Sequence, residues 1–183
     1  RDTAVLRLCD IFFDFRPVWG DGTAAADLRR HVTTLAKGNP AFLRQMYEDD
    51  IDHEVALGVF GRFITEKKDP AHTGEMNLKH TGTLPLVEAV RLMALREGIE
   101  SPSTIGRLDA LHEGQIIYDD EHDYLSGAFH HMCHLLLRQQ IAQAKAGEPV
   151  SVFIPLDSLS ERERDILVDS FKAVRTLRPR IRG

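Results

Sequence analysis

Charged residues inside otherwise apolar segments are the first features of this sequence that could do chemistry. In Phe12–Asp21, Asp14 and Arg16 stand among large apolar side chains. A buried charge is costly unless it is paired, so either these two pair or Arg16 faces a site that binds an anion. Lys79, just before Gly82, could act as a point charge near phosphates. From residue types alone, structural pairing is the more common outcome for Arg16.

Transfer of phosphoryl or nucleotidyl groups needs carboxylates gathered around Mg²⁺, usually an Asp-apolar-Asp pair that follows a Gly-Ser turn. Asp50-Ile51-Asp52 has this spacing, but no Gly-Ser turn precedes it and it ends a predicted helix. We interpret the pair as solvated helix surface. No catalytic residue is assigned to this chain.

Two histidines four residues apart on a predicted helix, His130 and His134, could share a metal ion. The zinc-protease pattern requires Glu after the first histidine, and His131 stands there instead. Cys133 points about 100° away from His134 on an α-helix, which excludes it as a third ligand. We interpret the histidines as an exposed helix face and predict no metal site. Walker, Rossmann and Ser-His-Asp patterns are also missing from the sequence.

The composition limits the class of protein. A chain of 183 residues fits a single domain, 1–183, and a net charge of -5 gives no general attraction to nucleic acid or anionic lipid. The sequence contains no apolar run of the roughly 20 residues that a membrane span needs. Two cysteines among apolar neighbours fit a reducing cytoplasm. The start at Arg1 suggests a piece of a longer protein.

The elements that must position these residues are mostly helices, because apolar residues recur with helical spacing along most of the chain. Six or seven helices are expected, near 3–15, 21–38, 40–47, 85–97, 103–111 and 121–146, with the last running from Ser160 through Val174. Ser103 and the Ser160/Glu163 capping box mark the starts of two of them. Glycines and Pro70 predict a small irregular or hairpin excursion near 57–83, with any β-structure confined to about 60–80. The fold class predicted is an all-α helical bundle.

A set of segments in one order then points to a family. They are FFDFRPVWGD (12–21), NLK (77–79), LPLVEAVRLMAL (84–95), TIGRLDAL (104–111), AF (128–129), LRQQ (137–140) and PLDSLSERERDILVDSFKAVRTL (155–177). Together they resemble the nucleotidyltransferase substrate-binding domain, the C-terminal helical domain of bacterial CBS-domain signalling proteins. Each segment alone is weak, but the ordered set covers nearly the whole chain.

The resemblance implies a catalytic domain before this one, with the Gly-Ser and Asp-x-Asp motif, and CBS or cyclic-nucleotide-binding domains further upstream. Mg²⁺ and a nucleoside triphosphate are then expected in the full-length enzyme, and this chain alone is expected to be inactive. The expected partners are that catalytic domain, the triphosphate and an acceptor that could be a protein.

A more distant similarity is to the uridylyltransferase of the PII nitrogen-signalling protein. It rests on Asp14, Arg16, Gly20, Asp21 and the segment 77–79. Those enzymes continue after the lysine with Gly-Gly-Leu-Arg-Asp, whereas this chain continues with His-Thr-Gly-Thr-Leu-Pro. Related domains also often have arginine where this chain has leucine at 136. These departures disfavour PII itself as the acceptor.

The resemblance implies that Arg16 and Lys79 hold triphosphate or acceptor groups, with Asp14 and Asp21 orienting them. Arg107 and Arg138 are weaker candidates for the same wall of a cleft. We therefore predict that Arg16 and Lys79 lie close together on one concave face. Two alternatives stay open: a helical interaction module that relays upstream sensor domains, and a metal protein using His130 and His134.

Overall fold

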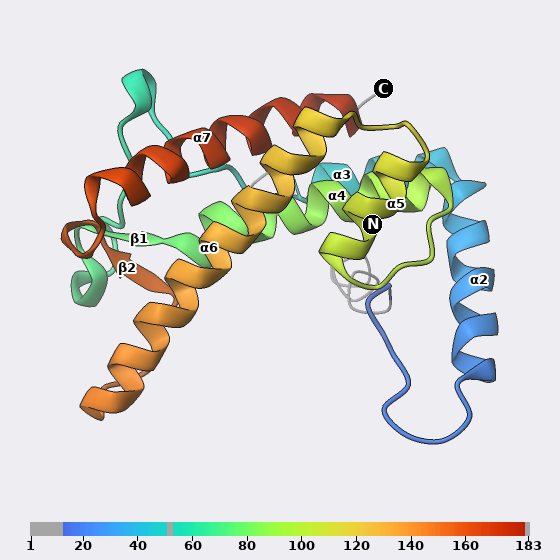
Figure 1. Cartoon of the computed structure of the whole chain (residues 1–183), viewed down its shortest axis with the longest axis horizontal. Helices are drawn as coiled ribbons and strands as arrows, with labels where there is room; N and C mark the ends of the chain where they lie inside the picture. The colour runs from blue at the N-terminus through green and yellow to red at the C-terminus, as the bar shows by residue number, and fades with distance from the viewer. Residues whose placement is uncertain (1–12, 51–52, 182–183) are drawn as a thin grey trace. The chain divides into compact units, whose positions relative to one another are not determined.

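The computed structural model describes residues 13–50 and 53–181 (Figure 1). The helices are α2 (Thr23–Lys37), α3 (Pro40–Asp50), α4 (Leu84–Glu97), α5 (Thr104–Glu113), α6 (Asp119–Ala146) and α7 (Glu161–Leu177). The strands are β1 (Glu75–Asn77) and β2 (Phe153–Pro155). The all-α class is confirmed, and α6 is the longest described helix, as predicted. The helix expected near 3–15 lies mostly outside the described residues, and Phe13 and Asp14 form a turn.

Side-chain caps explain where several helices begin. Ser103 Oγ accepts the backbone N–H of Gly106 at 3.1 Å, which starts α5. At α7, Glu163 accepts the N–H of Ser160 at 2.9 Å, and Ser160 Oγ accepts the N–H of Glu163 at 3.3 Å. Both predicted caps are confirmed, because capping depends on residues within one turn of each other.

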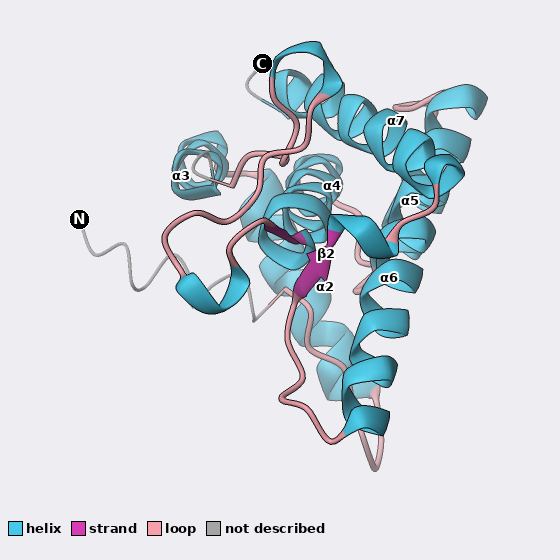
Figure 2. Cartoon of the chain, turned by 90° about the vertical axis from the view of Figure 1, so that its left-hand side faces the viewer, coloured by secondary structure: helices cyan, strands magenta, loops and turns pink. Residues whose placement is uncertain are grey.

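The expectation that β-structure is confined to about 60–80 is wrong. β1 pairs with β2, antiparallel, with Met76 opposite Ile154 (Figure 2). Within 57–83 the structure has short helical turns and an isolated bridge between Leu57 and Phe63. A three-residue strand has little periodicity, and its partner lies far along the chain, so local patterns could not show the pairing.

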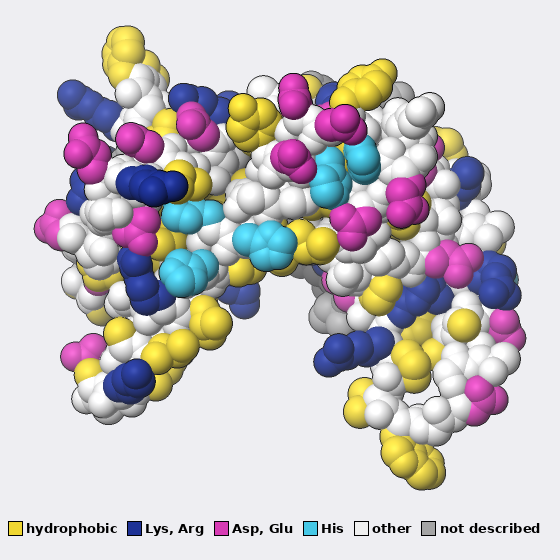
Figure 3. Space-filling view, viewed as in Figure 1, with side chains coloured by type: hydrophobic (Ala, Val, Ile, Leu, Met, Phe, Trp, Pro, Cys, Tyr) yellow, Lys and Arg dark blue, Asp and Glu magenta, His cyan; other side chains and the backbone are white. Residues whose placement is uncertain are grey.

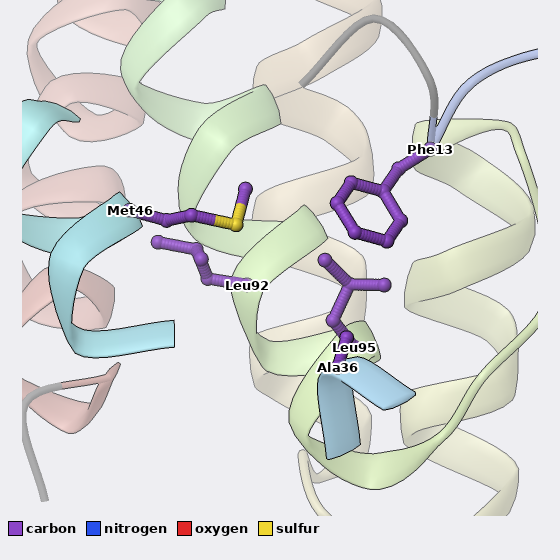
Figure 4. Packing of buried hydrophobic residues seen from close by; sticks show 5 residues of the cluster. All are labelled: Phe13, Ala36, Met46, Leu92 and Leu95. Atoms are coloured by element: carbon purple, nitrogen blue, oxygen red, sulfur yellow. The ribbon is translucent and has the colours of Figure 1, made fainter. Parts of the chain in front are cut away.

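The contacts group the chain into two compact units, which we describe separately. The first comprises Arg1–Asp52, Val87–His122 and Arg180–Gly183. Its core brings together Phe13, Ala36, Met46, Leu92 and Leu95 (Figure 4). The Phe13 ring also lies 6.2 Å from that of Phe42. Burial of Phe13 anchors the segment that carries Asp14 and Arg16.

The second unit comprises His53–Leu86 and Asp123–Pro179. A wide helical turn, Lys79–Thr83, leads into α4, and its Gly82 is buried. A Cβ atom at Gly82 would lie 2.6 Å from Leu78 Cδ1, 3.0 Å from Met132 Sδ and 3.2 Å from Phe171 Cε1. Only glycine therefore fits this packing without displacing neighbours. Across the residues that the structure describes, no helix is long and apolar enough to cross a membrane.

We predict that Gly82→Ala lowers the free energy of unfolding by about 1–3 kcal/mol, because the added methyl overpacks a buried contact. The matched control is Gly127→Ala on α6, where a Cβ meets no atom within 4 Å. That change should raise stability by about 1 kcal/mol through helix propensity. Urea unfolding of both variants measures the difference. Equal stability of the two variants would contradict the packing described for Gly82.

Candidate functional site

Asp14 is the centre of a cluster of charged side chains in the first unit. One carboxylate oxygen accepts a hydrogen bond from Arg107 Nη2 at 2.7 Å, and the other accepts one from Arg91 Nη2 at 2.7 Å. The side chains of Arg91 and Arg107 are only 8% and 3% exposed, whereas that of Asp14 is 35% exposed. Asp14 thus supplies a half-exposed counter-charge to two buried guanidinium groups.

Arg107 and a third arginine, Arg29, hold the residues on either side of Asp14. The carbonyl oxygen of Phe13 accepts hydrogen bonds from Arg107 Nη2 at 3.2 Å and from Arg29 Nη1 at 3.1 Å. The guanidinium of Arg29 also lies 4.4 Å from the centre of the Phe15 ring, a cation–π distance. Arginines from α2, α4 and α5 therefore fix three consecutive residues, Phe13–Phe15, which we call the stem.

Burial and neighbouring charges act on Arg107 in opposite directions. Burial is the main cause that lowers the pKa of Arg107, while Asp14 raises it and the nearby Arg91 and Arg29 lower it further. An arginine in a protein nevertheless stays protonated at neutral pH, so Arg107 carries its charge. Asp14 therefore stabilises a charged guanidinium inside the first unit.

Arg16 directly follows the stem and is exposed. Asp14 takes Arg91 and Arg107 as partners in place of Arg16, so the pairing considered for these two residues does not occur. Within residues 13–50 and 53–181, Arg16 makes no hydrogen bond or ion pair. Its guanidinium is available to a ligand.

Asp21 lies at the other end of the segment that carries Arg16, just before α2. Its carboxylate accepts hydrogen bonds from the backbone N–H of Thr23 at 2.9 Å and from Thr23 Oγ1 at 2.6 Å. These bonds, the side-chain one first, lower the pKa of Asp21. Asp21 thus lies one residue before Gly22, the cap position of α2, and fixes where the helix begins.

Lys79 opens the wide helical turn of the second unit and is exposed. Its side chain has no hydrogen bond or ion pair in the part of the chain that the structure describes. Arg16 and Lys79 belong to different units. Their sharing of one concave face therefore stays a prediction.

Arg138 is engaged in an ion pair. It bonds to the carboxylate of Glu163 and donates to the carbonyl of Ser158 at 3.4 Å. The pKa of Glu163 is lowered from 4.5 to about 2. The main cause is the hydrogen bond from the N–H of Ser160, and the next is the hydrogen bond from Arg138. In this arrangement Arg138 fastens the start of α7 to α6.

The candidate metal ligands His130 and His134 both lie on α6. His130 Nδ1 lies 2.8 Å from the carbonyl oxygen of Ser126 one turn earlier on α6, and His134 is exposed. Histidine side chains are visible on the surface in Figure 3. Among the described residues, no three His, Cys, Asp or Glu side chains are grouped to hold a metal ion. The pair at Asp50 and Asp52 extends outside the described residues.

Sequence reasoning missed Arg91 and Arg29. A signal for Arg91 was present, because Glu88 and Arg91 are the only charged residues in the apolar run 84–95. The same argument that singled out Asp14 and Arg16 applies there. Arg29 lies on a helix with many polar residues, so nothing local distinguishes it.

Comparison with known proteins identifies the family. The family model described as "Putative nucleotidyltransferase substrate binding domain" matches residues 40–183, which is most of the chain. The chain belongs to this family, as the ordered motifs indicated. No curated protein and no solved structure matches it. Arg91 and Arg107 lie inside the matched range and Asp14 before it, so their ion pairs join the unmatched segment to the family's domain.

We predict that Asp14→Asn lowers the free energy of unfolding by about 3 kcal/mol, because two buried arginines lose their shared counter-charge. Asp27→Asn is the control, since Asp27 makes an exposed ion pair with Arg30 at 3.0 Å. That change should cost less than about 0.5 kcal/mol. Thermal or urea unfolding checks both. If Asp14→Asn lowers the free energy of unfolding as little as the control does, Asp14 is not the counter-charge on which the two arginines depend.

A pH dependence follows from Glu163. Its pKa is lowered to about 2, so its charge stabilises the fold above pH 4.5, and this contribution is lost as the pH falls toward 2. Glu163→Gln retains the capping geometry but lacks the charge, and should cost about 1 kcal/mol at pH 7. The difference from the parent chain should shrink below pH 4.5, measured by urea unfolding at several pH values. Glu161→Gln, in the same helical turn, is the control and should show a smaller effect. A constant difference down to pH 3 would contradict the assignment.

Proposed function

We propose that this chain forms one wall of the active cleft of a bacterial nucleotidyltransferase similar to the PII uridylyltransferase. The catalytic carboxylates would lie in a preceding domain. Family membership supports the substrate-binding role. The observation that carries the proposal is Arg16, an exposed arginine without an internal partner among the described residues, next to a stem held by three further arginines.

In this proposal the chain binds and orients but performs no bond-making step. Arg16 offers a planar fork that can bind two oxygens of a phosphate or carboxylate at once, and Lys79 offers a point charge. Asp14 and Asp21 act as positioning residues, because each fixes one end of the segment that carries Arg16. Arg107 acts through Asp14, and Arg138 contributes through the start of α7.

Mg²⁺ and the nucleoside triphosphate are assigned to the catalytic domain, where the metal would neutralise phosphate charge. What this chain adds is a fixed orientation of the substrate, which lowers the entropic cost of reaching the transition state. The acceptor is left as an unidentified group, such as a protein side chain. Upstream CBS or cyclic-nucleotide-binding domains would then regulate the reaction.

We predict that Arg16→Ala and Lys79→Ala, each made in the protein with its catalytic domain, lower the transferase activity about ten- to hundred-fold. Melting temperatures should stay within about 1 °C of the parent, because both side chains are exposed and make no internal bond among the described residues. Arg44→Ala on α3, also an exposed arginine of the first unit, is the matched control. Transferase assays and thermal unfolding are run side by side.

Two results would contradict the proposal. One is unchanged activity in Arg16→Ala together with a large drop in melting temperature, which would make Arg16 part of the scaffold. The other is turnover of a labelled nucleoside triphosphate by this chain alone. A protein that binds no nucleotide even with the preceding domain present would favour the interaction-module alternative.

A further inference from the structure

The segment between the stem and α2 carries two large apolar side chains in water. Val18 is 94% exposed and Trp19 is 96% exposed. Trp19 is also the only tryptophan of the chain. In Figure 1 this segment extends away from the helices of its unit, and Figure 3 shows apolar side chains at its tip. An exposed aromatic side chain and an exposed cation in one short loop are the two groups that nucleotide-stacking sites combine.

The tip is held at both ends. At one end, the three arginines of the cluster bind the stem. At the other, Asp21 bonds to Thr23, and a Cβ atom on Gly22 would lie 3.6 Å from Pro17 Cγ. Gly20 has a φ of 85°, a left-handed conformation that favours glycine and turns the chain back. The loop therefore presents Arg16, Val18 and Trp19 on one closed turn.

We infer that the loop Phe15–Gly20 binds a nucleotide through two groups, with Trp19 stacked on the base and Arg16 bound to a phosphate. This inference rests on the proposed function. An indole face can stack on any base, and such stacking changes affinity about ten- to hundred-fold. The exposed guanidinium of Arg16 suits the phosphate charge, which favours a nucleotide over an uncharged ligand. Because every base has a π-face, the loop should discriminate poorly between bases.

The test uses the protein with its catalytic domain, a non-hydrolysable nucleoside triphosphate and inorganic triphosphate, which has no base. Trp19→Ala should weaken nucleotide binding about tenfold or more and leave triphosphate binding unchanged. Trp19→Phe should restore most of the loss, because phenylalanine keeps a stacking face. Arg16→Ala should weaken both ligands. Phe60→Ala is the control, because Phe60 is also 96% exposed but lies in the second unit, and it should change neither affinity.

Fluorescence gives a second readout. The emission of Trp19, taken as the difference between the parent and Trp19→Phe, should be quenched by the nucleotide and not by inorganic triphosphate. Unchanged nucleotide affinity in Trp19→Ala, with both affinities reduced in Arg16→Ala, would overturn the stacking inference and leave the proposed function standing. If neither variant affects nucleotide binding, the stacking inference fails, and the transferase assay of Arg16→Ala decides the proposed function. Weakened binding of a protein acceptor alone in Trp19→Ala would also overturn the inference, since the loop would then dock a protein.

Discussion

The ion pairs of Asp14 with Arg91 and Arg107 are the constraint on which the first unit depends. Two guanidinium groups are buried on neighbouring helices, and burying a charge is tolerated only when a counter-charge reaches it. Asp14 supplies that charge from a segment with no regular structure, while Phe13 beside it is buried in the hydrophobic core. The electrostatic and the hydrophobic anchor fall on adjacent residues. Together they set where the chain leaves the core, and so where Arg16 and Trp19 meet solvent.

This arrangement separates residues that hold the fold from residues available to a substrate. Arg107 donates a hydrogen bond to Asp14, and Arg138 donates one to Glu163, so both side chains are engaged inside the protein. The side chains of Arg16 and Lys79 make no hydrogen bond among the described residues. A substrate-binding domain needs both kinds of cation, because a binding group is useful only when its backbone is fixed. The family membership of the chain agrees with a role in binding a substrate.

The sequence predicted what depends on neighbouring residues. Ser103 and the pair Ser160 and Glu163 marked helix starts correctly, since a cap bonds within one turn. The pairing of β1 with β2 was out of reach, because it joins distant three-residue segments. The same limit applies to the site. Asp14 stood out as a charge among apolar residues, but its partners lie 77 and 93 positions away on helices that pack only after folding. Local patterns therefore found the carboxylate and proposed the wrong arginine, Arg16, as one possible partner.

The central claim is that Arg16 reaches the substrate while Asp14 holds the segment that carries it. A crystal structure of the protein with its catalytic domain and a bound non-hydrolysable nucleoside triphosphate tests this most directly. The account predicts a guanidinium nitrogen of Arg16 within hydrogen-bonding distance of a phosphate or acceptor oxygen, with the Asp14 ion pairs intact. A nucleotide bound only by the catalytic domain, with Arg16 facing bulk solvent, would contradict it.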